Sequence, residues 1–211
     1  MKIITPSYDY EQSFIKQGFL LVAGVDEAGR APLAGPVAAG AVILDTTSKK
    51  PWLDDVRDSK LLSPRMRLKL ESVIQREAIS WGVGMVYSTE IDDYGIARAA
   101  RVAMKKAIAQ LNPPPHAILI DYFRLPEVNL PQKGITRGDS LSFSIACASI
   151  LAKVARDRLM TEMDERYPEY GFCRNKGYAT PEHLKALKKI GPCAIHRFSF
   201  HPLKPRMEII P

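Results

Sequence analysis

Two apolar stretches of the sequence each end in carboxylates. The stretch from Phe19 to Val25 is followed directly by Asp26 and Glu27, and the stretch AILID ends at Asp121. Short apolar runs bounded by turn residues are typical of buried strands, and ligand sites gather at the carboxyl ends of strands in α/β sheets. The pattern therefore favours an α/β fold, in which these acids meet if the two strands lie side by side and parallel.

A cluster of such acids predicts a metal site. Charges are costly inside an apolar sheet unless they are paired or bound to metal. Three carboxylates raise one another's pKa, so they need a counter-charge that a divalent cation supplies. Because no His or Cys lies nearby in the sequence, the oxygen ligands favour Mg²⁺ or Mn²⁺ over zinc. Asp139, in RGDS at the start of the longest predicted helix, is the fourth candidate ligand.

Each acid also has an ordinary structural explanation. Asp139 has the position and chemistry of a helix N-cap. Asp26 and Glu27 could instead be a turn acid and a surface acid, because adjacent residues on a strand face opposite ways. For both to reach one site, the strand must end or twist at Glu27, which Gly29 makes possible.

The remaining pattern predicts alternating strands and helices. Residues 19–25 and 37–44 are expected to form a hairpin-like pair, and further strands are expected at 80–87 and 116–120. Four helices are expected, each with a recognisable start or stop signal. Their predicted bounds are 63–78 with Ser63 as N-cap, from Thr89 as N-cap to the prolines at 113–115, from Asp139 or Ser140 to Arg166, and from Thr180–Pro181 to Gly191.

The charge of the chain favours a polyanionic partner. The net charge is +7 and the sequence pI is about 9.3, which is typical of nucleic-acid-binding proteins, although basic surfaces also occur without that role. Between Arg174 and Arg206 there are eight Lys or Arg residues and one acid, Glu182. A phosphate backbone would be attracted to this end of the chain.

Several basic and aromatic positions are candidates for contact with nucleic acid. They are Lys60 in the DSK segment, Lys153 in KVARDR, and Tyr178, which lies in a glycine loop before a helix. The alternatives are that the charges form a solvated helix face and that the tyrosine anchors its loop by packing. The four histidines show no metal-ligand spacing and are interpreted as core or surface residues.

The composition predicts a single globular unit in the cytoplasm. No apolar run approaches the ~20 residues needed to cross a bilayer, and the first residues lack the apolar core of a signal peptide. The three cysteines are odd in number and form no CxxC pair, which fits a reducing compartment and argues against disulfides.

Taken together, the motifs closely resemble those of the bacterial ribonuclease HII family. Six segments occur in the family's order. They are GVDEAGRAPLAGPV, DSKLLSP, the acid of IDYF, GDSLSFSIACASILAKVARDRLM, YGFCRNKGYATPEHLKAL and GPCAIHRFSF. The resemblance implies an RNase H-like fold, a mixed five-stranded sheet flanked by helices, over residues 1–211 as one catalytic domain. It also implies a basic C-terminal helical segment from about residue 167 that binds substrate.

The resemblance implies a metal-dependent endoribonuclease. The family hydrolyses RNA in RNA–DNA hybrids and cuts 5′ to a single ribonucleotide in duplex DNA, as in ribonucleotide excision repair, leaving 5′-phosphate and 3′-hydroxyl ends. One Mg²⁺ or Mn²⁺ lowers the pKa of the attacking water and a second stabilises the leaving 3′ oxygen. The expected partners are these nucleic acids, with no membrane, and the chain is expected to be a monomer.

Residue by residue, the resemblance assigns the site. Four positions match the family's catalytic, metal-binding acids: Asp26, Glu27, Asp121 and Asp139. Substrate contacts are implied for Gly29, Arg30, Ala31, Lys60, Lys153 and Tyr178. The family's tripeptide of Gly-Arg-Gly reads the 2′-hydroxyl through its backbone, and the tyrosine packs against the following deoxyribose.

Ala31 is the clearest departure from the family pattern. If residue 31 requires a positive φ or has no room for a methyl group, alanine costs on the order of 1 kcal/mol and shifts the backbone that senses the ribose. If its φ is negative, little changes. Tyr122, where glycine is common, and Asn175, where histidine is common, are smaller departures outside the acid set. The alternative function is a nucleic-acid-binding protein with impaired junction cleavage because of Ala31; a phosphatase of small substrates is a third, which the basic end disfavours.

Overall fold

The computed structural model describes residues 5–203, and five strands form one mixed sheet in it. In the order β3-β2-β1-β4-β5, the central β1 is antiparallel to β2 and parallel to β4. The strands are β1 (Val22–Ala28), β2 (Val37–Ile43), β3 (Ser80–Val86), β4 (Ala117–Asp121) and β5 (Gln132–Ile135). The hairpin-like pair expected from the sequence is therefore confirmed, and β1 and β4 meet the condition posed for their acids, because they lie side by side and parallel.

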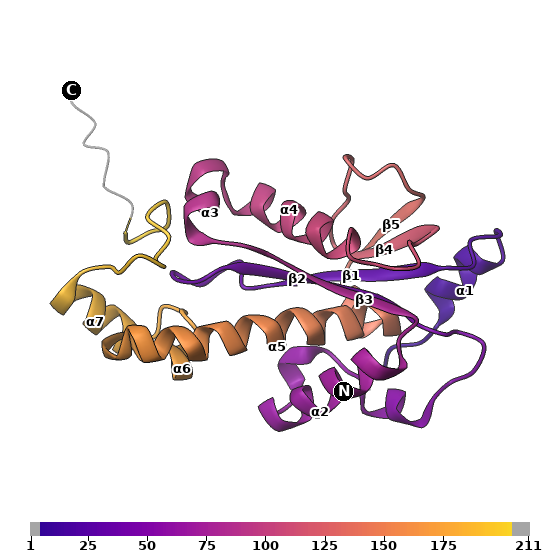
Figure 1. The fold of residues 1–211 in the computed structure, drawn as a ribbon, viewed down its shortest axis with the longest axis horizontal. Coiled ribbons are helices and arrows are strands. Elements are labelled where there is room, and N and C mark those ends of the chain that lie inside the picture. Colours follow the sequence, from indigo (N-terminus) through magenta and orange to yellow (C-terminus); the bar gives the residue numbers. More distant parts are fainter. Residues whose placement is uncertain (1–4, 204–211) are drawn as a thin grey trace.

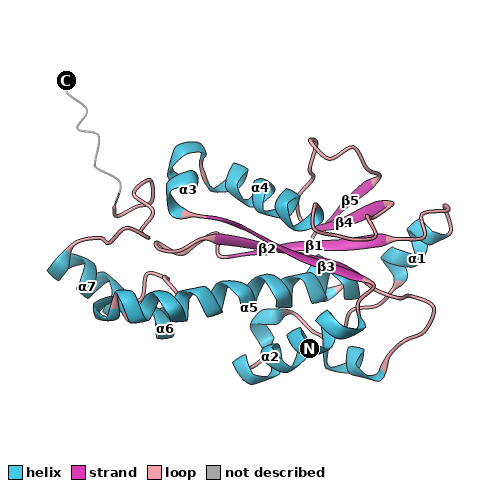
Figure 2. Cartoon of the chain, viewed as in Figure 1, coloured by secondary structure: helices cyan, strands magenta, loops and turns pink. Residues whose placement is uncertain are grey.

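Helices cover both faces of this sheet. The α-helices are α1 (Asp9–Ile15), α2 (Pro64–Glu77), α3 (Ser88–Tyr94), α4 (Ile96–Ile108), α5 (Phe143–Arg166), α6 (Phe172–Asn175) and α7 (Pro181–Ile190). Helices α3 and α4 lie on one face, and α5 lies on the other with α2 packed beyond it (Figure 1). Helices α6 and α7 continue past the end of the sheet (Figure 2). The predicted mixed five-stranded sheet with flanking helices and a C-terminal helical segment is confirmed.

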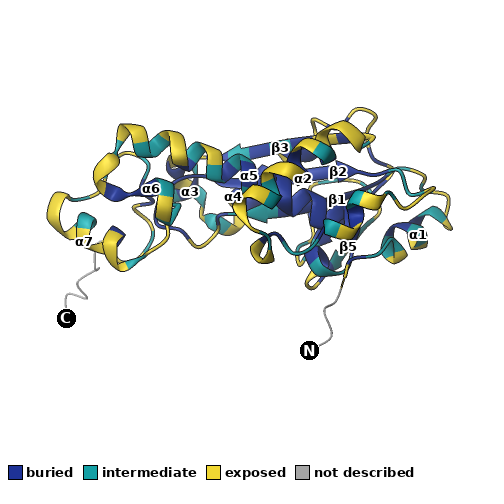
Figure 3. Cartoon of the chain, turned by 90° about the horizontal axis from the view of Figure 1, so that it is seen from below, coloured by how far each residue is buried: buried dark blue, intermediate teal, exposed yellow. Residues whose placement is uncertain are grey.

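The close approach of α5 to the sheet depends on small residues. A methyl group at Gly24 would overlap the backbone of Ser144, and one at Gly40 would overlap the carbonyl of Ala148. All seven residues of β2 are buried, and the buried strands lie inside a shell of partly exposed helices (Figure 3). Because the helix axis can lie so near the sheet, side chains from α5 reach the carboxyl end of β1.

Helix boundaries differ from the predictions at two places. The helix expected from Thr89 to the prolines is two helices, with Tyr87 as the first N-cap and a break at Gly95, whose φ is +81°. Asp139 is not an N-cap, because it lies in the 3₁₀ turn η3 (Gly138–Ser140) and Ser142 caps α5. The predicted Ser63 and Thr180 caps of α2 and α7 are confirmed by hydrogen bonds to their third helical residues.

The short elements α1 and β5 were not expected from the residue pattern. Helix α1 is held by the buried carboxylate of Glu11, whose Oε1 accepts hydrogen bonds from Ser142 and Ser144 at the start of α5. Within residues 5–203, no helix combines the length and the apolar character needed to span a bilayer.

Candidate active site

A cavity of about 750 Å³ opens at the carboxyl ends of β1 and β4. This is the edge at which parallel strands of α/β sheets present ligand sites. The residues that line it are Glu27, Arg30, Asp58, Lys60, Asp121, Tyr122, Thr136, Arg137, Asp139 and Ser140. Three of the four predicted acids are among them.

Asp26 and Asp121 end up on adjacent strands. The last pair in the parallel register joins Val25 to Ile120, so each acid is the next residue along its strand. Asp26 is only 4% exposed, and its Oδ1 accepts the backbone N–H of Glu27 at 2.7 Å. Asp26 therefore lies beneath the cavity that Glu27 and Asp121 line.

A hydrogen bond links the β4 acid to the turn that carries Asp139. Oδ1 of Asp121 accepts the backbone N–H of Gly138 at 2.7 Å. Asp139 is buried and follows directly in η3 (Gly138–Ser140). Its location is thus set by β4 and by the start of α5 together, which explains how an acid 18 positions after Asp121 in the sequence returns to the same edge.

The electrostatics of these acids favour a bound cation. Burial raises the pKa of Asp26 well above its usual range, and the charges of Glu27 and Asp121 raise it further. Burial also raises the pKa of Glu27, against the opposing charge of Arg30. Burial raises the pKa of Asp121, although the hydrogen bond from Gly138 opposes this. These carboxyl groups resist ionising together, and a divalent cation would remove that cost.

The donor set fits a hard divalent cation, although the acids are not gathered as a finished ligand cluster. In the described part of the chain, no three His, Cys, Asp or Glu side chains converge to hold a metal. Two carboxylates are instead paired with cations: Glu27 Oε1 lies 3.4 Å from Arg30 and Asp139 Oδ2 lies 3.5 Å from Lys60. The buried Oε2 of Glu27 has no hydrogen-bond partner. An orphaned carboxylate oxygen beside other buried acids is what an oxygen-ligated cation would satisfy.

The segment Gly29–Ala31 borders the same cavity and is held from behind by one buried arginine, while a second buried arginine holds the residues that follow it. Arg197 donates to the carbonyl oxygens of Gly29 (2.6 Å) and Arg30 (2.9 Å). Arg156, on α5, donates to the carbonyl of Pro36 at 2.9 Å. Gly29 has a φ of +90°, and a side chain there would overlap Arg156. Because the carbonyls are held inward, the orientation of this backbone does not depend on substrate.

Alanine is compatible with position 31. The non-glycine residues with positive φ in the described chain are Tyr122, Arg137 and Lys176, and Ala31 is not among them. Its side chain is exposed. The sequence analysis posed two possibilities for residue 31, a positive or a negative φ. The structure has no positive φ there, so alanine adds no left-handed backbone strain.

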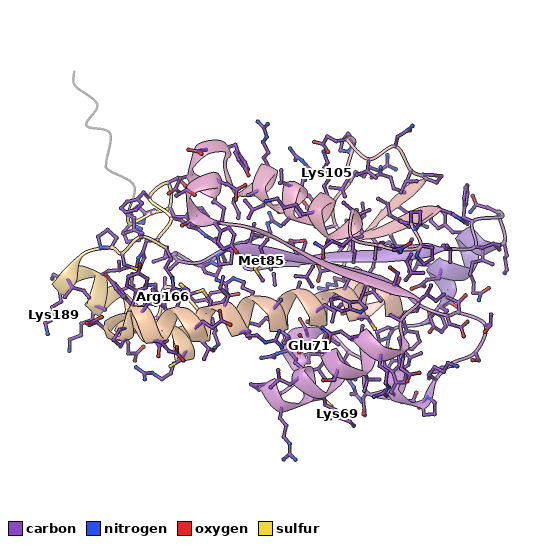
Figure 4. The ribbon with its side chains drawn as sticks, in the orientation of Figure 1. Lys69, Glu71, Met85, Lys105, Arg166 and Lys189 are labelled. Atoms are coloured by element: carbon purple, nitrogen blue, oxygen red, sulfur yellow. The ribbon has the colours of Figure 1, made fainter. Side chains whose placement is uncertain are left out.

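Lys153 and Tyr178 do not line the acidic cavity. They line a second cavity of about 670 Å³ between α2, α5 and α6, together with Arg67, Arg158, Arg174 and Lys176. Lys153 pairs with Asp157 at 2.7 Å, whereas Tyr178 is 42% exposed. Glu71 lies where α2 faces α5 (Figure 4) and accepts two hydrogen bonds from Arg158, at 2.8 and 3.0 Å. Of the predicted substrate residues, Arg30 and Lys60 therefore line the acidic cavity, whereas Lys153 and Tyr178 line the second, basic cavity.

Basic side chains also lie beyond the sheet. Arg166 at the end of α5 and Lys189 on α7 lie in the same part of the molecule (Figure 4). Both belong to exposed helix faces. Acids flank Arg166 in the sequence, at Glu162, Asp164, Glu165 and Glu169. The excess of positive charge therefore lies on α7, where Lys185, Lys188 and Lys189 outnumber Glu182, and this helix is the part that would attract a phosphate backbone.

Sequence patterns did not identify the buried polar residues that support the site. Arg156, Arg197, His183 and His196 are each no more than 1% exposed. The KVARDR segment, which contains Arg156, suggests a nucleic-acid groove or a solvated helix face, and the histidines are expected in the core or at the surface, without a role in the site. The available signal was an arginine that follows the long apolar start of α5, but its partners lie about 120 residues away in the chain.

Comparison with known proteins identifies a family with the same architecture. A family model described as Ribonuclease HII matches residues 23–203. A Ribonuclease HII from Dehalococcoides mccartyi is 51% identical over 207 residues, which cover 98% of this chain and 98% of that protein.

Solved structures share the fold. The ribonuclease H2 from Pyrococcus horikoshii OT3 is 27% identical, with a TM-score of 0.74, and the match covers 87% of this chain and 95% of that one. A structure titled as Bst-RNase HIII in complex with Mn²⁺ has a TM-score of 0.71 at 17% identity, covering 88% of this chain and 68% of that one. The second likeness concerns the fold alone.

Proposed function

The chain belongs to the ribonuclease HII family of RNase H hydrolases, and we propose that it cleaves RNA in RNA–DNA hybrids and nicks duplex DNA 5′ to a single ribonucleotide. The products would carry 5′-phosphate and 3′-hydroxyl ends. The observation that carries the proposal is the cavity in which Glu27, Asp121 and Asp139 lie above buried Asp26, bordered by the Gly29–Ala31 segment.

The four acids would hold divalent cations, Mg²⁺ or Mn²⁺, in the active complex. Support comes from their raised pKa values and from the partnerless oxygen of Glu27. When bound, two such ions supply positive charge to the scissile phosphate, lower the pKa of the attacking water and stabilise the leaving oxygen. Lys60 and Arg30, now paired with Asp139 and Glu27, would be released toward the phosphates of the substrate.

The chain's own residues would select the ribose. The carbonyls of Gly29 and Arg30 are committed to Arg197, which leaves the opposite edges of these peptides to meet the 2′-hydroxyl. The exposed ring of Tyr178 would pack on the next deoxyribose. Lys153 and the other basic side chains of the second cavity would contact phosphates. Residues from about 167 would form the substrate-binding segment of a single catalytic domain.

A comparison of labelled substrates tests the proposal. Wild type and Asp121→Asn would be assayed on an RNA–DNA hybrid and on a single-ribonucleotide duplex, in Mg²⁺ and in Mn²⁺. We expect cleavage of both substrates by wild type and loss of both in the variant, while Glu127→Gln, at an exposed acid, stays active. Tight binding of both duplexes by wild type without cleavage in either metal would favour the nucleic-acid-binding alternative.

A further inference from the structure

Two buried histidines face each other behind the Tyr178 loop. His183 lies on α7 and His196 follows it, and their side chains are 0% and 1% exposed. The Nε2 atoms of the two rings are 3.0 Å apart. Tyr170 and Phe172 pack against both rings, with the Phe172 ring 5.4 Å from that of His183 and the Tyr170 ring 4.9 Å from that of His196.

The partners at both ends of this pair fix where its protons lie. A carbonyl oxygen can only accept, so His183, whose Nδ1 lies 2.8 Å from the Tyr178 oxygen, must carry its proton on Nδ1. A backbone N–H can only donate, so Nδ1 of His196, 2.9 Å from the N–H of Cys193, must be bare. The remaining proton of His196 lies on Nε2 and is donated to Nε2 of His183.

The nearby carbonyl of Cys193 does not change this assignment. It lies 3.2 Å from Nδ1 of His196, but it already accepts the backbone N–H of His196 at 3.0 Å. A proton on Nδ1 would also place two bare Nε2 atoms against each other. The hydrogen bonds thus run in one direction, from Cys193 through His196 and His183 to Tyr178.

Both imidazole rings must be neutral for this series of hydrogen bonds to form. An added proton on His183 would set two N–H groups face to face, and one on His196 would face the N–H of Cys193. Burial lowers the pKa of His183, and burial, together with the neighbouring His183, lowers the pKa of His196 to about 4. Both directions agree with the geometry.

The last hydrogen bond of this series reaches the backbone of Tyr178, whose ring is proposed to pack on the substrate. The carbonyl of Tyr178 accepts both His183 Nδ1–H and the N–H of Thr180, the latter at 2.8 Å. On its other side, the carbonyl of Gly177 accepts the N–H of Leu33 at 2.8 Å, which ties this loop to the segment after Ala31. The peptide on each side of Tyr178 is therefore fixed, although its ring is exposed.

We propose that His183 and His196 form a neutral, directional hydrogen-bonded pair that positions Tyr178 for recognition of the sugar beside the cleaved bond. The proposal rests on the proposed function for the role of Tyr178, but not for the arrangement of the pair. His183 and His196 touch no substrate and act through the backbone of Tyr178. Their replacement should affect substrates that depend on Tyr178 more than the cleavage step itself.

Two amide substitutions separate the contacts of His183. In His183→Asn the side-chain amide can occupy the position of Nδ1 and still donate to Tyr178. In His183→Gln the amide extends toward the position of Nε2, and the bond to Tyr178 is lost. For the single-ribonucleotide duplex we expect H183Q to raise KM about fivefold or more with a smaller change in kcat, as for loss of one hydrogen bond. H183N should stay within about twofold of wild type.

Nitrogen-15 NMR of the histidine rings tests the pair without any assay of activity. Wild type should show His183 protonated on Nδ1, His196 protonated on Nε2, and neither ring charged at pH 6. H183Q should shift the ring resonances of Tyr178, and H183N should not. His196→Asn keeps an acceptor for Cys193 but removes the donor to His183, so it should shift the Nε2 resonance of His183 while the proton stays on Nδ1. This variant serves if H183Q does not fold. His116→Gln, at an exposed histidine, is the control.

The outcomes are distinguishable. Equal effects of H183N and H183Q on KM and on the Tyr178 resonances, or a proton on Nδ1 of His196, would overturn the pair. If wild type cleaves neither substrate, the proposed function fails, and the NMR signals still decide whether the pair holds Tyr178.

Discussion

The buried guanidinium of Arg197 donates a 2.6 Å hydrogen bond to the carbonyl oxygen of Gly29, 168 positions earlier in the chain. The same group also reaches the carbonyls of Arg30, Gly35 and Pro36. A residue near the C-terminal end of the described chain thus sets the backbone at the edge of the acidic cavity. Only a planar group with several donors can serve these carbonyls together.

Arg197→Lys should therefore weaken both stability and ribose recognition. A lysine presents a point charge, and each buried carbonyl left without a donor costs about 1–3 kcal/mol. We expect thermal unfolding to shift downward and single-ribonucleotide cleavage to fall more than hybrid cleavage. Arg166→Lys, at an exposed arginine, is the matched control. Equal activity of Arg197→Lys and wild type on both substrates would refute the role of this clamp.

Asp26→Asn should separate catalysis from folding. The substitution removes a buried carboxyl group whose pKa is raised by burial and by the charges of Glu27 and Asp121. The metal-free variant should therefore be as stable as wild type, or more stable by about 1 kcal/mol. Cleavage should be lost, and calorimetric titration with Mn²⁺ should show weakened binding. Undiminished cleavage by this variant would contradict the assignment of Asp26.

Ala31→Gly should change little. Since φ at position 31 is not positive, glycine relieves no strain there and adds only flexibility, which costs about 0.5–1 kcal/mol at most. We expect the ratio of single-ribonucleotide to hybrid cleavage to remain within about threefold of wild type, because 1 kcal/mol corresponds to roughly that range. A large gain in that ratio would mean that Ala31 impairs ribose sensing after all.

Acid should destabilise the protein through the histidine pair. The folded-state pKa of His196 is lowered to about 4, so it contributes stability that is present above the unfolded value of about 6.5 and is lost as the pH falls toward 4. The pKa of His183 is also lowered by burial, so it acts in the same direction. The raised pKa values of the cavity acids act in the opposite direction. The double variant His183→Asn/His196→Asn isolates the pair: its urea midpoint should fall less than that of wild type between pH 7.5 and pH 5.5. Parallel pH profiles would contradict the effect.

Local sequence patterns were sufficient for the strands that carry Asp26 and Asp121. Their apolar runs are short and end at turns or acids. The parallel pairing of β1 with β4 was only a condition for the acids to meet, and the structure supplies it. The RNase H-like fold, with its mixed sheet of five strands, came from the family resemblance. The start of α5 was misplaced because Asp139 has good capping chemistry, whereas the chain turns through η3 before Ser142 caps the helix.

Long-range polar contacts could not be predicted from one sequence. Arg197 and His196 occur in a segment without clear periodicity, and the partners of Arg197 lie about 160 positions away. Lys153 and Tyr178 line the second cavity and not the acidic one, and this location depends on how α5 and α6 pack. Hydrophobic periodicity carries no information about such packing.

The most direct test of the proposed function is to map the nick in a labelled DNA duplex that carries one ribonucleotide, with Mg²⁺ or Mn²⁺ and with a chelator as control. We expect a single metal-dependent cut 5′ to the ribonucleotide, leaving a 3′-hydroxyl and a 5′-phosphate. Cleavage that persists in the chelator, or a cut at another position, would contradict it.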